Sequence, residues 1–208
     1  MKIIGLIAVV VVTLLVGSYF LTSSRNNTPT PSSRIGPFPT DIEQQVQPTS
    51  DTSALRAGGS SYLDSEGIYN FLYPPDYKLD TSDEVHIRIY KAGATQTGQT
   101  EMYDGVLVVF ETINRGNQTL EQWVDNNIKN STADGTLKII NPKKATTING
   151  YPGFTYRTQG LGEAEYYVFA KDDSSKNALV ITTAVNDPKN VGFENEVKTI
   201  LSTVELFK

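Results

Sequence analysis

The sequence predicts an α+β fold in which a central antiparallel β-sheet is flanked by helices, an α/β/α sandwich. Three observations lead to this prediction. Segments in which polar and apolar residues alternate dominate the chain beyond residue 60. Turn-forming residues join several of these segments as hairpins, and consecutive hairpins produce an antiparallel sheet. Two stretches with helical apolar spacing can cover the faces of that sheet.

The first expected strand covers residues 67–73 and ends at Pro74, because proline cannot donate to a strand ladder. In the next strand, over residues 85–90, Val85, Ile87 and Ile89 alternate with polar residues, so one face is polar. Residues 106–110 are apolar at every position, which predicts a central strand.

A helix is expected to begin at Thr119, because Thr119 and Gln122 form a capping-box pattern ahead of apolar residues at helical spacing. Asn149 and Gly150 are a strong signal for a tight hairpin turn. The remaining strands are expected over residues 137–140, 145–148, 153–158, 164–170 and 179–185. An amphipathic helix starting near Phe193 closes the chain.

Length and charge restrict the possible functions. The chain has 208 residues and no cysteine, which excludes disulfides, thiol nucleophiles and thiolate zinc sites. Residues 61–208 contain 14 Lys and Arg against 20 Asp and Glu, a net charge of −6. Because phosphate backbones require clustered cations, nucleic acid is excluded as an expected partner.

The N-terminal part divides into an apolar segment and a polar one. Residues 3–21 carry no charge and, at about 1.5 Å rise per residue, nearly span a bilayer core of roughly 30 Å. We expect a single-pass anchor over residues 1–21, with the N-terminus cytoplasmic and the C-terminal domain outside the cytoplasm. A cleaved signal peptide and secretion is the alternative. Residues 22–60, rich in Ser, Thr and Pro, predict a disordered linker, and residues 61–208 a single domain.

Four groups of residues carry this chain's resemblance to a known family. They are the aromatic run from Tyr69 to Pro74, the helix residues Leu120 and Trp123, the hairpin over 148–156, and the closing series Phe193, Val197, Ile200 and Ser202. Over residues 67–208 the chain resembles the PsbP-like superfamily. The resemblance implies a central antiparallel sheet flanked by helices. It also implies an accessory or adaptor role, since members include extrinsic photosystem subunits, a Ran-binding protein and bacterial envelope proteins.

No set of residues predicts a catalytic site. His86 is the only histidine, and no nucleophile turn of the GxSxG type accompanies it. Residues 93–100 have the glycine spacing of a phosphate loop, but Gln99 stands where the lysine is required, so no cofactor is expected. Glu163 and Glu165, two apart on a strand, would share one face and are the candidate metal ligands.

Aromatic residues on adjacent predicted strands have two possible roles. Alternate positions point to opposite faces, so one subset fills the core and the other could form a surface for protein contact. The candidates for contact are Tyr151, Tyr156, Tyr167 and Phe169.

We therefore expect a membrane-tethered, extracytoplasmic accessory or protein-binding domain without catalytic activity. Its expected partners are the membrane, through residues 3–21, and another envelope protein. Two alternatives stay open: an envelope glycan or peptide hydrolase built on dispersed carboxylates, and a domain that binds a solute or calcium.

Overall fold

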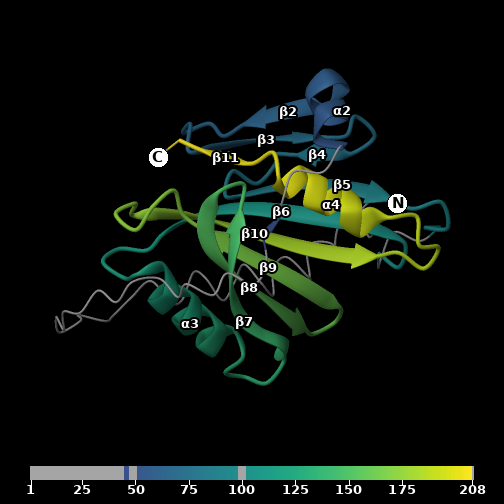
Figure 1. Ribbon diagram of the computed structural model, residues 1–208. Helices are drawn as coiled ribbons and strands as arrows, with labels where there is room; N and C mark the ends of the chain where they lie inside the picture. Colours follow the sequence, from purple (N-terminus) through teal and green to yellow (C-terminus); the bar gives the residue numbers. More distant parts are fainter. Residues whose placement is uncertain (1–44, 47–50, 98–101, 208) are drawn as a thin grey trace.

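The computed structural model describes residues 45–46, 51–97 and 102–207. These residues form a large and a small β-sheet with helices on both faces of the large one (Figure 1). The predicted α+β class, with a central antiparallel sheet flanked by helices, is confirmed.

The large sheet has the strand order β1-β7-β8-β9-β10-β6-β5-β4, and its neighbours are antiparallel except for β1 and β7. Its strands are β1 (Gln45–Val46), β4 (Lys78–Asp80), β5 (His86–Ala92), β6 (Gly105–Asn114), β7 (Lys138–Ile148), β8 (Tyr151–Gln159), β9 (Glu163–Phe169) and β10 (Asn177–Asn186). The small sheet has the order β11-β3-β2, with β2 (Ser60–Leu63), β3 (Tyr69–Tyr73) and β11 (Glu205–Leu206). The helices are α2 (Asp51–Gly58), α3 (Leu120–Ser131) and α4 (Phe193–Leu201).

The two faces of the large sheet bury two separate apolar cores, because successive side chains of a strand point to opposite faces. On one face, α4 and the small sheet pack against β5, β6 and β10, and the ring of Phe71 on β3 stacks on Phe110 of β6 with 3.9 Å between centroids. On the other face, α3 packs against β8 and β9 through Leu120 and Val124. Figure 1 shows α3 and α4 on opposite faces of the large sheet.

Local signals in the sequence define several element boundaries. The side chain of Thr119 accepts a hydrogen bond from the backbone N–H of Gln122, and the Gln122 side chain accepts one from the Thr119 N–H, so the predicted capping box is confirmed. Asn149 and Gly150 have φ angles of 47° and 86° and form the two-residue turn between β7 and β8, as predicted.

The structure differs from the sequence-based expectations in three places. The first predicted strand does not join the central sheet: β3 pairs with β2 and with the C-terminal β11. Val85 precedes β5 and is exposed instead of sharing the apolar face of that strand. The two short strands expected on either side of residue 142 are one continuous strand, β7, whose register against β8 shifts twice around Asn141.

A disordered linker was expected over residues 22–60, but residues 51–58 at its C-terminal end form the helix α2. Leu55 of α2 is buried, and the helix contacts β3 and α4. A segment rich in small polar residues is expected to be disordered when it buries no apolar side chain, but here the buried Leu55 stabilises a helix.

The anchor predicted over residues 3–21 lies outside the described residues. Among those described, no helix combines the length and the hydrophobicity needed to cross a membrane.

Candidate functional site

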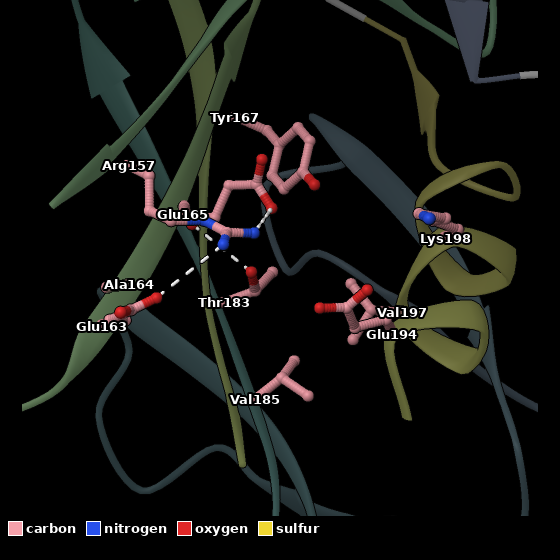
Figure 2. A pocket seen from close by; sticks show the side chains of 10 residues that line it. All are labelled: Arg157, Glu163, Ala164, Glu165, Tyr167, Thr183, Val185, Glu194, Val197 and Lys198. Atoms are coloured by element: carbon pink, nitrogen blue, oxygen red, sulfur yellow. Dashed lines mark hydrogen bonds and ion pairs between the residues drawn. The ribbon is translucent and has the colours of Figure 1, made fainter. Parts of the chain in front are cut away.

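An open cavity of about 200 Å³ lies between α4 and the adjoining strands β8, β9 and β10 (Figure 2). Charged and hydroxyl-bearing side chains dominate its lining, and Val185 and Val197 contribute smaller apolar parts. The polar residues that line it are Arg157, Glu163, Glu165, Tyr167, Thr183, Glu194 and Lys198.

Strand register brings the sheet side of the cavity together. Arg157 of β8 stands directly opposite Glu165 of β9, and Glu165 stands opposite Thr183 of β10. Directly paired residues point to the same face of a sheet, as do residues two apart on one strand. Glu163 and Glu165 therefore share one face, as the sequence predicted, and Arg157 lies beside both.

Ion pairs hold the sheet side of the cavity. Nη2 of Arg157 lies 3.3 Å from Oε2 of Glu165, and Nη1 lies 3.8 Å from Oε2 of Glu163. Burial, followed by the negative charge of Glu165, raises the pKa of Tyr167, and Glu194 adds to this effect while Arg157 opposes it. The Tyr167 hydroxyl therefore stays protonated and donates towards Glu165.

Two charged side chains of α4 line the helix side of the cavity. Glu194 and Lys198 lie four residues apart on α4, a spacing that places them on the same side of the helix. Within the described part of the chain, neither side chain forms an ion pair. Figure 2 shows the Glu194 carboxylate pointing across the cavity towards Thr183.

The predicted metal ligands Glu163 and Glu165 are brought together, but the Arg157 guanidinium lies next to both carboxylates. A cation already occupies the position that a metal ion would take between them. Over the residues that the structure describes, no group of three His, Cys, Asp or Glu side chains is arranged to hold a metal.

The aromatic candidates for protein contact are placed mostly in the cores, which corrects the expectation that they form an exposed surface. Tyr156, Tyr167 and Phe169 are buried, and Tyr151 is half-buried. The Tyr156 ring stacks on Tyr166 beneath α3. Both faces of β8 and β9 are covered, one by α3 and the other by α4 and the small sheet. Aromatic side chains that point to either face are therefore buried.

His86 lies on the face of the large sheet opposite to the cavity, next to Glu111 of β6. Its Nδ1 is 2.8 Å from Oδ2 of Asp83, and its Nε2 is 3.9 Å from Oε2 of Glu111. Burial raises the pKa of Glu111, His86 opposes this effect, and Asp83 adds to it. Both ring nitrogens of His86 therefore face carboxylates, which is not the arrangement of a base beside a nucleophile.

Sequence reasoning did not find Arg157, Thr183, Glu194 or Lys198. One sequence feature could have indicated Glu194 and Lys198 as cavity residues. They lie four residues apart on an amphipathic helix, on the side next to its apolar stripe. No local pattern could show that this helix packs next to β9 and β10.

No protein-family model matches this chain, and no curated protein sequence matches it either. Solved structures with a similar arrangement exist. A protein of Bacteroides thetaiotaomicron VPI-5482 matches 72% of this chain at 15% identity with a TM-score of 0.39, and this chain spans about half (49%) of that protein.

Two further structures match over most of their own length. The solution structure of cyanobacterial PsbP (CyanoP) from Synechocystis sp. PCC 6803 matches 73% of this chain and 94% of its own, at 11% identity and a TM-score of 0.44. The Ran-binding protein Mog1p of Saccharomyces cerevisiae matches 72% and 95%, at 8% identity and a TM-score of 0.47. At these values the similarities carry no conclusion about activity, and the fold class rests on the sheets and helices described above.

Proposed function

We propose that this chain is a membrane-tethered accessory domain outside the cytoplasm, which binds another envelope protein and catalyses no reaction. The observation that carries the proposal is the cavity beside α4, because Glu194 and Lys198 face it without ion-pair partners in the described part of the chain. Charged groups placed at a cavity without internal partners are available to groups of a binding partner.

The hydroxyl groups of the cavity support binding more than catalysis. Thr183 is buried, and its Oγ1 donates to the backbone oxygen of Glu165 at 3.4 Å. The Tyr167 hydroxyl is kept protonated by its raised pKa. Thr183 donates to a backbone oxygen and not to a side-chain base, and the pKa of Tyr167 is raised and not lowered, so neither hydroxyl is arranged as an activated nucleophile.

Exposed aliphatic side chains next to the cavity residues support a protein as the partner. Leu161 is 81% exposed and precedes Glu163 by two residues, whereas Val191 is 61% exposed and precedes Glu194 by three. Apolar groups beside a charged cavity are a common composition for protein interfaces. The tether is proposed from the apolar segment over residues 3–21, and the PsbP-like resemblance of residues 67–208 is compatible with an accessory role.

Site-specific photo-crosslinking in intact membranes tests the proposal. The full chain would carry a photoreactive phenylalanine derivative at Leu161 or Val191, and at Lys129 on α3 as the matched exposed control on the other face. We expect the first two positions to yield one and the same protein adduct that Lys129 does not yield. Equal adducts from all three positions, or adducts with lipid alone, would contradict the proposed contact surface.

The tether is tested separately by alkaline carbonate extraction of membranes that contain the full chain. We expect the chain to stay in the membrane pellet, because an apolar segment of nineteen residues is inserted. Complete release into the supernatant would contradict a spanning segment and would favour secretion after cleavage.

A further inference from the structure

The charges at the cavity indicate which chemical group it can accept, and this step rests on the function proposed above. Three carboxylates line the cavity against two cationic side chains. Arg157 already contacts Glu163 and Glu165, so its charge is compensated. The Glu194 carboxylate faces the cavity with no ion pair inside the described chain, which leaves a site for a positive charge opposite the sheet.

The size of the cavity favours one side chain over a free small molecule. Pockets for small ligands measure roughly 300–1,000 Å³, whereas this cavity measures about 200 Å³. A water molecule takes about 30 Å³ of liquid volume, so the cavity exceeds what one or two waters fill. The end of a long side chain fits between these limits.

Charge and surface composition agree with a protein that carries this side chain. The chain has a net charge of −5, which attracts a basic surface at long range. Leu161 and Val191, exposed near Glu163 and Glu194 in the sequence, offer aliphatic contacts that a free metal ion or a small polyamine could not use. A flexible aliphatic stem with a cationic end meets both requirements.

We propose that the cavity receives a lysine or arginine side chain of the partner protein, with its cationic group between Glu194 of α4 and Glu165 of β9. Arg157 keeps the two sheet carboxylates in place, and aliphatic residues beside the inserted side chain contact Leu161 and Val191. Burial is the main cause of the raised pKa of Tyr167, and the charges of Glu165 and Glu194 add to it while Arg157 opposes them.

Methyl NMR of the full chain in lipid nanodiscs tests this inference, with Val185 and Val197 as reporters inside the cavity. The probes are the capped tripeptides acetyl-Leu-Lys-Leu-amide and acetyl-Leu-Arg-Leu-amide. The control is the same peptide with norleucine, which keeps the stem but lacks the charge. We expect saturable shifts with the two cationic peptides and none with norleucine. Equal shifts with norleucine, or larger ones with a glutamate peptide or with calcium chloride alone, would overturn the inference.

Matched variants separate a specific contact from general electrostatics. We expect Glu194→Gln to weaken binding of the lysine peptide by roughly 2- to 5-fold, the range of an exposed ion pair. Glu84→Gln, which removes an equal charge from an exposed loop away from the cavity, should change binding by less than about 2-fold. Lys198→Met should strengthen binding, because it removes a competing cation.

Equal effects of the Glu194 and Glu84 variants, or weaker binding by Lys198→Met, would contradict the proposed occupant. The result is distinguishable from that of the crosslinking experiment. If Leu161 gives a specific protein adduct but the cationic peptides cause no shifts, the proposed binding function is supported and the proposed lysine or arginine occupant is contradicted.

Discussion

An ion pair joins β5 to α4, the helix that forms one wall of the cavity. Nζ of Lys91 lies 2.9 Å from Oε1 of Glu196 on α4 and 2.9 Å from Oδ2 of Asp76. Nζ of Lys91 also lies over the rings of Tyr77 and Phe193, 5.5 Å from each centroid. We predict that Lys91→Met, which keeps most of the stem and removes the charge, lowers the free energy of unfolding.

The magnitude follows from the exposure of each partner. The Asp76 side chain is 57% exposed, so this pair contributes about 0–1 kcal/mol. The Glu196 side chain is 30% exposed, so its charge-assisted bond contributes somewhat more, about 1 kcal/mol after discounting for solvent. The expected loss is about 1–2 kcal/mol, equivalent to roughly 2–8 °C in melting temperature for a domain of this size.

Thermal unfolding followed by circular dichroism on the full chain in detergent, at pH 7.5, measures this loss. Desolvation lowers the pKa of Lys91, but its bonds to Asp76 and Glu196 outweigh that effect and raise it. A raised folded pKa means that the contribution is complete below the unfolded pKa of about 10.4 and is lost as pH rises through the folded value. At pH 7.5 the contribution is therefore fully present.

The matched control is Lys78→Met on β4. Lys78 is exposed and lies 5.9 Å from the centroid of the Tyr90 ring, so its loss should change stability by less than about 0.5 kcal/mol. A double-mutant cycle of Lys91→Met with Glu196→Gln should give a coupling energy of about 1 kcal/mol. Equal melting temperatures for the Lys91 and Lys78 variants would contradict a stabilising contribution of the Lys91 ion pairs.

Three further predictions concern the cores. Phe71→Ala should lower the free energy of unfolding by about 3–5 kcal/mol, measured by urea titration, because it removes a fully buried ring stacked on Phe110. Gly153→Ala should cost about 1–3 kcal/mol in the same assay, since an added Cβ would lie 2.4 Å from a backbone oxygen of β9. Glu111→Gln should raise the melting temperature at pH 8, and the gain should disappear towards pH 4. Burial raises the pKa of Glu111, so its stability contribution is complete below the unfolded pKa and is lost as pH rises through the folded one.

Each of these predictions has an outcome that contradicts it. Biphasic unfolding of the wild-type chain, with Phe71→Ala affecting one phase alone, would mean that the two sheets do not form one cooperative unit. An unchanged midpoint for Gly153→Ala would show that β8 and β9 can separate at no cost. A Glu111→Gln variant that loses stability at pH 8 would mean that the contacts of the Glu111 carboxylate outweigh the cost of its burial.

Most secondary structure could be predicted from the sequence because it rests on local signals. The Thr119 capping box and the Asn149–Gly150 turn each act within a few residues. The pairing of β3 with the C-terminal β11 joins residues about 135 positions apart, and no local pattern specifies such a pair. The helix α2 depends on the packing of Leu55 in the same way.

Composition and residue periodicity are enough to define the fold class of this domain and the chemical groups that it carries. The sequence determined an α+β domain of net negative charge without cysteine and the shared face of Glu163 and Glu165, because these follow from composition and the two-residue period of a strand. The tertiary structure decided what those carboxylates meet. Strand register set Arg157 beside them, and the packing of α4 on the sheet placed Glu194 across the cavity. Register and helix docking are set by contacts between residues distant in the chain, which is why only the folded protein shows this cavity.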